Sequence, residues 1–397
     1  MDRRRFLAAA AASPWLRVAT FPPLAAGAAA VAVAAPPADG RYRRLLVLVE
    51  LKGGNDGLNT VVPFADPAYH ALRPKIAIAR GEVVQLSDRA GLHPALAPLL
   101  PLWQDGRLAV LQGVGYPEPN LSHFRSIEIW DTASRSEEYL HDGWLTRAFA
   151  AAPVPRAFAA DGVVVGSNDL GPLAGTDTRA LAIADTEQFL RRARLAQPGA
   201  AAGNKALAHI LKVEGDIVQA AGHLDANVAL ATAFPRTGFG NAAKTAARIV
   251  ANPSGVAVVR LTLSGFDTHA NQPATQARLL SELADGLVAL RAALVELDKW
   301  NDTLVLTYAE FGRRPKENQN SGTDHGTANV HFALGGRVAG GFYGEAPDLT
   351  RLTGDGNPAH TLDFRAVYAT VLQRWWGIDP GDALGGRFAP VPYLPSA

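Results

Sequence analysis

The stretch Leu45-Leu46-Val47-Leu48-Val49-Glu50 decides the expected fold, and it leads into Lys52-Gly53-Gly54-Asn55-Asp56-Gly57. Its apolar residues do not alternate with polar ones, which is typical of a strand buried on both faces. Glycine and small polar residues then indicate a loop at the carboxyl end of that strand. The stretch therefore predicts a strand in the interior of a sheet.

Helical and strand patterns alternate beyond this first strand. A helix-like stretch at residues 93–104 precedes an apolar run at residues 108–111, and a further apolar run covers residues 256–263. Leucines at steps of four and three then predict an amphipathic helix, followed by a buried strand at residues 303–307. These leucines are Leu279, Leu283, Leu287, Leu290, Leu294 and Leu297. Alternation of this kind gives parallel strands covered by helices, so we expect a three-layer α/β/α domain with a mostly parallel sheet.

Two regions complete the expected domain, which runs from residue 42 to residue 390. Alanine-rich helical patterns follow one another over residues 201–252 without a convincing strand. We expect a helical cap or insertion there, at about residues 200–252. Near the end of the chain, Thr361 is the expected N-cap of a helix over residues 363–376.

The N-terminus has the features of an export signal. Arg3 and Arg4 stand ahead of Phe6-Leu7 and of an alanine-dominated apolar run that ends at Ala35. The pattern resembles the twin-arginine signal, although Asp2 stands where Ser or Thr is usual.

The apolar run that follows is interrupted by prolines, a glycine and Arg17, too often for a stable membrane-spanning helix of about 20 residues. The tripeptide Ala32-Val33-Ala34 fits a cleavage site. We therefore expect residues 1–35 to be a removable signal that the twin-arginine export machinery reads. The remaining chain would be periplasmic or secreted, with no stable membrane span.

The composition excludes several kinds of site. The chain has no cysteine, which excludes disulfides, iron–sulfur clusters, thiolate metal sites and a cysteine nucleophile. A metal must therefore bind to His, Asp and Glu. Basic and acidic residues number 38 and 37, for a net charge of +1, and nothing indicates nucleic acid as a partner. No nucleotide cofactor is expected.

Four polar loops follow predicted strands, at residues 53–59, 120–125, 265–272 and 310–331. In an open parallel sheet, ligands bind in the crevice beyond the carboxyl ends of the strands. We therefore expect the four loops to lie close together.

Two of these loops hold candidate metal ligands. Asp267 and His269 are two residues apart at a strand end, and the last loop offers Glu310, Asp324, His325 and His331. Carboxylate and imidazole ligands suit zinc, manganese or magnesium, and the histidines favour a transition metal. The alternative stays open that each histidine is a hydrogen-bonded core or capping residue.

Ser122 opens a helical pattern in the second loop. The free N–H groups and the dipole at a helix N-terminus stabilise an anion, so Ser122 is a candidate nucleophile or anion anchor. Serine is also a common N-cap, and that alternative stays open. The neighbouring His123 does not indicate a Ser-His relay, because adjacent helical residues rarely face each other.

Five segments carry a resemblance over essentially the whole chain after the signal. They are ELKGGNDGLN (50–59), GVGYPEPNLSHFRSIEIWDTA (113–133), LSGFDTHANQ (263–272), AEFGRRPKEN (309–318) and TDHGTANVHFALGG (323–336). In these segments the chain resembles the domain-of-unknown-function 1501 family and, more distantly, the alkaline phosphatase and sulfatase superfamily. The resemblance implies an alkaline-phosphatase-like α/β/α fold and a two-metal phosphate- or sulfate-ester site with a Ser, Thr or modified Cys nucleophile.

The resemblance also implies roles for single residues. The first strand of that superfamily ends in a metal-binding Asp, where this chain offers Glu50, Asn55 or Asp56. Ser122 stands where the nucleophile would begin its helix, and His325 resembles the last His ligand.

The match to the metal ligands is incomplete. Asp267 and His269 resemble the superfamily's Asp and His pair, which is usually spaced four apart. Phe311 follows Glu310 where the superfamily has adjacent Asp and His, so a phenylalanine replaces a ligand. A single-metal site, or none, is then an alternative to two metals.

The leading hypothesis is a hydrolase in which one divalent metal activates attack on a phosphate or sulfate ester. Its expected metal ligands are Asp267, His269 and His325, with Asp324, Asp56 or Glu310 assisting; its catalytic residues are Ser122 and Glu310; its substrate-binding residues are Asn120, Arg125, Arg313 and Arg314. The rival hypothesis is a noncatalytic binding or assembly protein that has lost ligands. A third has the polar loops bind carbohydrate or peptide, using Trp130, Trp144, Trp375 and Trp376.

Overall fold

The computed structural model describes residues 40–183 and 228–395. The chain separates into two units, Met1–Ala35 and Pro36–Ala397, and the fold described here is that of the second. No helix among the described residues is long and apolar enough to span a membrane.

A single sheet organises this unit, with strand order β13-β5-β12-β9-β1-β8-β6-β7 and β14 beside β5. Its strands are β1 (Leu45–Lys52), β5 (Leu108–Gly115), β6 (Ala160–Val165), β7 (Ala180–Ile183), β8 (Val256–Ser264), β9 (Thr303–Tyr308), β12 (Asn329–Leu334), β13 (Gly341–Tyr343) and β14 (Leu362–Asp363). Only β12 is antiparallel to its neighbours in this sheet. The first strand of the sequence lies between β8 and β9, and Val47 pairs with Val259 and Val305.

The side chains of β1 alternate between two cores, because successive residues of a strand point to opposite faces. Val47 and Val49 belong to the core on one face, while Leu46 and Leu48 belong to the core on the other. All four are almost completely buried. This double burial explains why the segment has no polar alternation.

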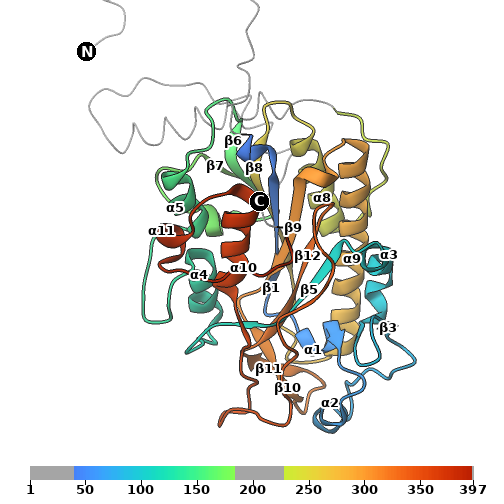
Figure 1. The fold of residues 1–397 in the computed structure, drawn as a ribbon. Helices are drawn as coiled ribbons and strands as arrows, with labels where there is room; N and C mark the ends of the chain where they lie inside the picture. Colours follow the sequence, from blue (N-terminus) through green and yellow to red (C-terminus); the bar gives the residue numbers. More distant parts are fainter. Residues whose placement is uncertain (1–39, 184–227, 396–397) are drawn as a thin grey trace, which may run out of the picture. The chain divides into compact units, whose positions relative to one another are not determined.

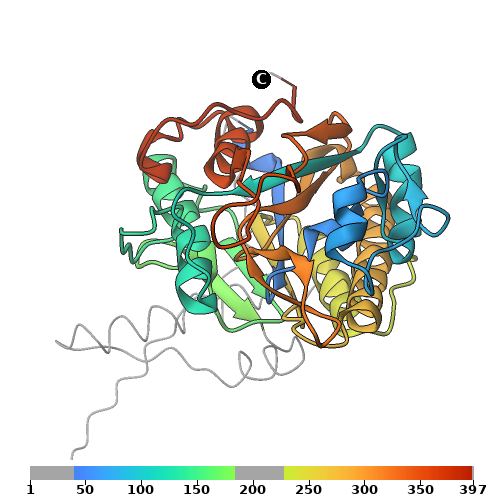
Figure 2. The same ribbon diagram turned by 90° about the horizontal axis from the view of Figure 1, so that it is seen from below.

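Helices cover both faces of the sheet, which gives three layers (Figures 1 and 2). One face carries α3 (Leu100–Gln104), α8 (Gly238–Val250) and α9 (Gln272–Glu296). The other carries α4 (His123–Thr132), α5 (Trp144–Ala151), α10 (Phe364–Thr370) and α11 (Gly381–Leu384). The expected three-layer α/β/α fold with a mostly parallel sheet is confirmed.

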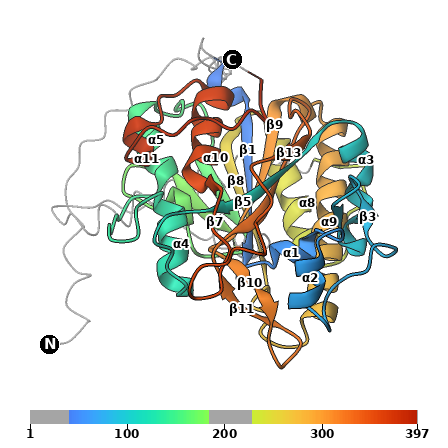
Figure 3. The same cartoon turned by 60° about the horizontal axis from the view of Figure 1, so that its bottom comes forward.

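Short elements gather at the carboxyl ends of the parallel strands (Figure 3). They are α1 (Gly57–Thr60), α2 (Pro67–Leu72), the hairpin of β10 (Gly312–Glu317) and β11 (Thr323–Gly326), and a small sheet of β2 (Val61–Val62), β3 (Val84–Gln85) and β4 (Gly91–Leu92).

The helix-like stretch at residues 93–104 is a 3-10 helix, Pro94–Leu99, followed by α3. Of the expected helical insertion, residues 200–227 lie outside the described residues, whereas residues 238–250 form α8, which packs against β8 and α9.

The expected N-cap at Thr361 is wrong. Leu362 and Asp363 pair with β5 as β14, which keeps the chain extended for two more residues. Asp363 is the N-cap of α10, and its side chain accepts a hydrogen bond from the Arg365 N–H. Beyond Thr370 the helix widens into a π-helix over Val371–Trp376.

Candidate metal centre

The four polar loops meet at one edge of the sheet, as the strand order predicts. Glu310, after β9, accepts hydrogen bonds from the Gly53 N–H after β1, at 2.9 and 3.1 Å. The same carboxylate contacts His123 at the start of α4, and Arg313 contacts Asp267 after β8. The expected convergence is confirmed.

Asp267 stands at the centre of a histidine cluster. Its Oδ1 lies 3.0 Å from His269 Nε2 and 3.2 Å from His325 Nε2, and those two nitrogens are 3.0 Å apart. Its Oδ2 lies 3.4 Å from His123 Nε2. The Nε2 atoms of three imidazoles therefore face one carboxylate, which is half-exposed to solvent.

The Nδ1 atoms of these rings face oxygen. His325 Nδ1 lies 2.8 Å from the Leu121 carbonyl, which can only accept, so this nitrogen carries the proton. His123 Nδ1 lies 2.9 Å from Glu310 Oε1, and His269 Nδ1 lies 3.5 Å from Asp324 Oδ1. A neutral ring that carries its proton on Nδ1, as His325 does, directs its Nε2 lone pair into the cluster.

Such an arrangement can hold a positive charge between the rings. With His325 protonated at Nδ1, its Nε2 lone pair faces His269 Nε2 at 3.0 Å and Asp267 Oδ1 at 3.2 Å. A proton on His269 Nε2, a second proton on His325 or a bound cation would each relieve the repulsion between these acceptors. Burial lowers the pKa of His325, although its hydrogen bonds to the Leu121 carbonyl and to Asp267 act in the other direction. Burial therefore opposes the second proton, and a metal cation fits this donor set.

Arg313 fixes the position of Asp267. Burial alone would raise the pKa of Asp267, but the hydrogen bond and charge of Arg313 outweigh it and lower the pKa to about 2. Arg313 Nη2 lies 2.7 Å from Asp267 Oδ1, and the guanidinium also donates to four carbonyls, those of Gly53, Gly54, Phe266 and Thr323. Its side chain is fully buried, so its charge is used inside the protein and not on a substrate.

The other candidate substrate-binding residues point elsewhere. Arg125 is buried and donates to the carbonyls of Arg135, Ser136 and Glu138, which ties a loop to α4. Arg314 is half-buried, and its carbonyl accepts a hydrogen bond from Arg73. None of these contacts faces the histidine cluster.

Asn120 and Ser122 lie beside the cluster without joining it. Asn120 Oδ1 accepts a hydrogen bond from the Ser122 N–H at 2.9 Å. Ser122 is the N-cap residue of α4, as expected from the sequence, but its exposed side chain makes no capping hydrogen bond. The hydroxyl is therefore not occupied by the cap.

Asp56 is separate from the cluster. Its carboxylate is fully buried and pairs with Arg73, also fully buried, while Oδ1 accepts a hydrogen bond from the Leu58 N–H at the start of α1. Gln272 donates to its other oxygen at 2.5 Å. Both oxygens of Asp56 thus have partners in the protein, and the expected role as a metal ligand does not fit this position.

His123 is the cluster residue that the sequence argument passed over. It lies in the second polar loop, at the start of α4, where the sequence pattern gives no sign of its direction. His331, an expected ligand, lies elsewhere. It is buried under Trp130, with ring centroids 5.3 Å apart, and does not reach the cluster.

Comparison with known proteins places the chain in a family. A family model described as "Protein of unknown function (DUF1501)" matches residues 109–386. The chain belongs to this family. No curated protein matches it.

Solved structures with a similar fold include three bacterial enzymes. The phosphonate monoester hydrolase of Silicibacter pomeroyi is 12% identical, with coverage of 87% of this chain and 75% of that one and a TM-score of 0.40. The lipoteichoic acid synthase LtaP of Listeria monocytogenes is 11% identical, with coverage of 88% and 76% and a TM-score of 0.38. An alkaline phosphatase of the Antarctic bacterium TAB5 is 13% identical, with coverage of 75% and 94% and a TM-score of 0.32.

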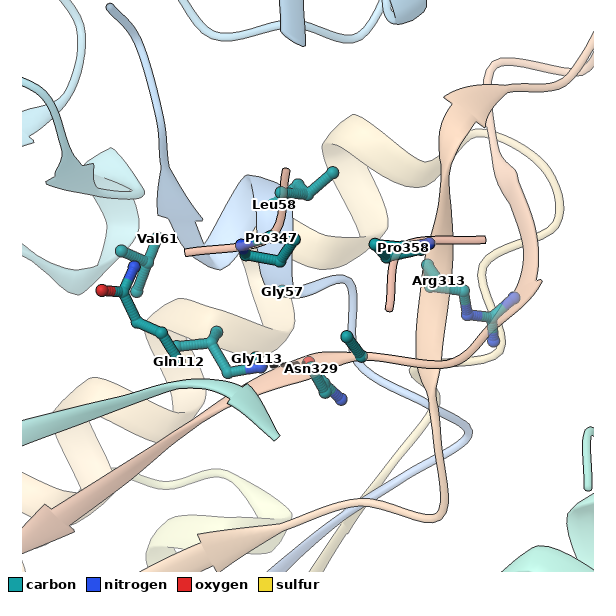
Figure 4. A pocket seen from close by; sticks show the side chains of 11 residues that line it. Gly57, Leu58, Val61, Gln112, Gly113, Arg313, Asn329, Pro347 and Pro358 are labelled. Carbon is teal, nitrogen blue, oxygen red and sulfur yellow. Dashed lines mark hydrogen bonds between the residues drawn. The ribbon is translucent and has the colours of Figure 1, made fainter. Parts of the chain in front are cut away.

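A hollow of about 380 Å³, its open mouth included, lies at the same edge of the sheet (Figure 4). Val61 and Gln112 line one side of it, and Arg313 and Pro358 line the other. Arg313 is common to the hollow and the cluster, since its guanidinium contacts Asp267. The hollow therefore lies next to the histidine cluster.

Proposed function

We propose that this family member is an exported, metal-dependent hydrolase of phosphate or sulfate esters. The observation that carries the proposal is the meeting of Asp267 Oδ1, His269 Nε2 and His325 Nε2 at 3.0 to 3.2 Å from one another. A tetrahedral zinc ion with ligands about 2.0 Å away separates those ligands by about 3.3 Å. The three atoms are therefore spaced as ligands of one ion of that size.

A divalent ion at this place would supply Lewis acidity and lower the pKa of a coordinated water. The chain's own residues would prepare the site for it. The Leu121 carbonyl holds the ring of His325 through Nδ1, and Arg313 holds Asp267. Rings and carboxylate held in this way need little rearrangement on binding, which favours affinity.

The ester would be anionic. Arg313 is neutralised by Asp267, so the positive potential of the site would come from the ion and from the N-terminus of α4, where His123 enters the cluster. Backbone N–H groups at a helix N-terminus stabilise phosphate and sulfate oxygens. The free hydroxyl of Ser122 at that end of α4 is the candidate nucleophile.

The test is metal content and ester hydrolysis measured on the same preparation of the chain without its signal. We expect one equivalent of zinc or manganese, and hydrolysis of an aryl phosphate or aryl sulfate that chelation abolishes. Asp267→Asn and His269→Gln should lose the metal and lower the rate by about a hundredfold or more. Asp348→Asn, which changes an exposed carboxylate outside the cluster, is the control and should retain both.

Two outcomes would contradict the proposal of a metal-dependent hydrolase. In the first the protein binds no stoichiometric metal; in the second it binds metal but hydrolyses no ester of a broad panel. In the second case the noncatalytic binding protein becomes the better description of the same fold.

A further inference from the structure

Phe311 stands where an expected ligand is missing, and its surroundings suggest what replaces that ligand. Its ring is buried, with its centroid 4.3 Å from that of His325 and 4.9 Å from that of His123. Both imidazoles pack against this apolar ring. Phe311 thus borders the cluster. It lies in the connection between β9 and β10, whereas His123 comes from α4.

His123 has the geometry of a ligand to the ion proposed above. Ligand atoms of His123, Asp267 and His325 all lie within 4.8 Å of one another. His123 Nε2 is 3.4 Å from Asp267 Oδ2, the carboxylate oxygen that the other two histidines leave open. The imidazole is about one-third exposed, which leaves it accessible from solvent.

Glu310 is built to hold this ring. Its side chain is almost fully buried, and both of its oxygens accept the Gly53 N–H. Ser126 Oγ donates to the Glu310 carbonyl, which fixes the backbone as well. Because both Glu310 oxygens already act as acceptors, the 2.9 Å contact indicates that His123 donates to Glu310 through Nδ1 and leaves Nε2 free. Metal-bound histidines almost always donate their other ring N–H to a carboxylate, a backbone carbonyl or a water.

We propose that His123 is a ligand of the same ion as Asp267, His269 and His325, and that Glu310 is the positioning residue that orients its ring. The inference rests on the metal centre of the proposed function and goes beyond it in two ways. It assigns the ligand that Phe311 cannot provide to a residue of α4. It also removes Glu310 from the ligands, because its oxygens are directed to Gly53 and His123.

The first experiment counts the histidine ligands. The chain without its signal is labelled with ¹⁵N-histidine and loaded with ¹¹³Cd, which couples to each nitrogen bound to it. Of the ten histidines, we expect three Nε2 atoms to show this coupling. His123→Gln should leave two coupled nitrogens, and His141→Gln, which changes an exposed histidine, should leave all three.

The second experiment tests Glu310 through its effect on His123. In the metal-free protein, the ¹⁵N shifts of wild type should show His123 protonated at Nδ1, and Glu310→Ala should convert this into a mixture of tautomers. Zinc affinity should fall by about ten- to a hundredfold. Glu310→Gln should restore part of both, since its amide oxygen can accept the Nδ1–H. Melting of the metal-free variants verifies that each is folded.

The outcomes separate this inference from the proposed function. Cadmium bound with only two coupled histidines, His123 not among them, overturns the ligand assignment and leaves the metal centre standing. Absence of any bound cadmium or zinc overturns the metal centre and this inference together. Unchanged tautomer and unchanged zinc affinity in a folded Glu310→Ala protein overturn the positioning role.

Discussion

Asp267 is the residue around which the polar cluster is arranged, and its neighbours differ in kind. Arg313 is a permanent cation that is buried and cannot leave. Three histidines face Asp267 through Nε2, and the Nδ1 atoms of His325 and His123 contact oxygen at 2.8 and 2.9 Å. A single carboxylate is therefore held by one fixed charge and faces three imidazole nitrogens, the donor set of the metal proposed above. Substitutions around it should thus affect metal binding before they affect folding.

Ser122 allows the nucleophile to be tested apart from stability. Its hydroxyl is exposed and makes no capping bond, so Ser122→Ala should change the free energy of unfolding by no more than about 0.5 kcal/mol. Hydrolysis should fall by orders of magnitude if this hydroxyl attacks the ester. The measurement is the rate of ester hydrolysis and the free energy of unfolding in urea, each for wild type and Ser122→Ala. A variant that keeps full activity would rule out Ser122 as the nucleophile.

His331 makes a pH-dependent contribution to stability. Neither of its ring nitrogens has a hydrogen-bond partner among the described residues, and burial lowers its pKa to about 3. In the unfolded chain the pKa is near 6.5. Between these two pH values the unfolded state binds a proton that the folded state does not. The free energy of unfolding should therefore decrease by about 1.4 kcal/mol for each unit by which the pH is lowered.

The measurement for His331 is the free energy of unfolding from pH 7 to pH 4, for wild type and His331→Leu. The stability of wild type should fall relative to that of the variant as the pH is lowered, because leucine takes up no proton. Parallel curves would show that the folded protein accommodates the charged ring.

At the scale of elements, the turn after β1 connects the sheet to the cluster. Gly53 and Gly54 both have positive φ, +114° and +75°, a region in which side chains are strained. Glu310 holds this turn by the Gly53 N–H, and Arg313 holds it by both carbonyls. The turn and the cluster share their supports, so a change in one should appear in the other.

Gly54→Ala should expose this coupling. A Cβ at this position would overlap the ring of Phe311, which packs on His325, and the backbone conformation disfavours alanine. We expect a loss of about 2 kcal/mol or more in stability and weaker zinc binding. Gly81→Ala, with no atom within 4 Å of the added Cβ, is the control and should stay within about 0.5 kcal/mol. Equal stability of the two variants would contradict the proposed strain.

The sequence predicts a helix or strand well where its pattern of apolar residues is compatible with only one kind of burial. The apolar run of β1 requires burial on both faces, and the leucine spacing of α9 requires one covered face, so both were recovered. Polar loops after parallel strands then had to meet, which predicted that Asp267, His269 and His325 would be neighbours.

The remaining details depend on side-chain direction, which the sequence pattern does not contain. The sequence does not show that the Arg313 side chain is buried and paired with Asp267, so it predicted a substrate contact for this residue. Asp56 is paired with Arg73, 17 residues farther along the chain, and α2, which leads to Arg73, packs against the hairpin strand β10. His123 points into the cluster because α4, which follows β5 in the chain, begins beside the cluster. No local sequence pattern predicts the position or direction of that helix start.

For the whole molecule, metal binding should appear as stability. An ion that binds the folded state alone adds about 2.7 kcal/mol at a concentration of 100 times its dissociation constant. Zinc should therefore raise the melting temperature of wild type, and chelation should reverse the change. His325→Ala should abolish the shift, while Asp348→Asn should preserve it. A wild-type melting temperature that does not respond to zinc, manganese or magnesium would contradict the proposed metal binding at the histidine cluster.

Export is the second prediction at this scale. The paired guanidinium groups of Arg3 and Arg4 carry the twin-arginine resemblance, so replacing both with Lys should retain the protein in the cytoplasm. Fractionation of cells that express either form measures this. Substitution of Arg17 by Lys, farther along the signal, is the control. Normal export of the double variant would rule out the twin-arginine route.

The order of events in folding follows from where the cluster residues lie in the sequence. Leu121 and His325, which share a hydrogen bond, are 204 positions apart, and β12 approaches the sheet edge from the opposite direction to its neighbours. The donors meet only after β1, β5, β8 and β9 have assembled. The metal proposed above would therefore bind only after the domain has folded. If the twin-arginine prediction holds, the chain folds before it is exported, so the complete site would first be open to ions of the cytoplasm.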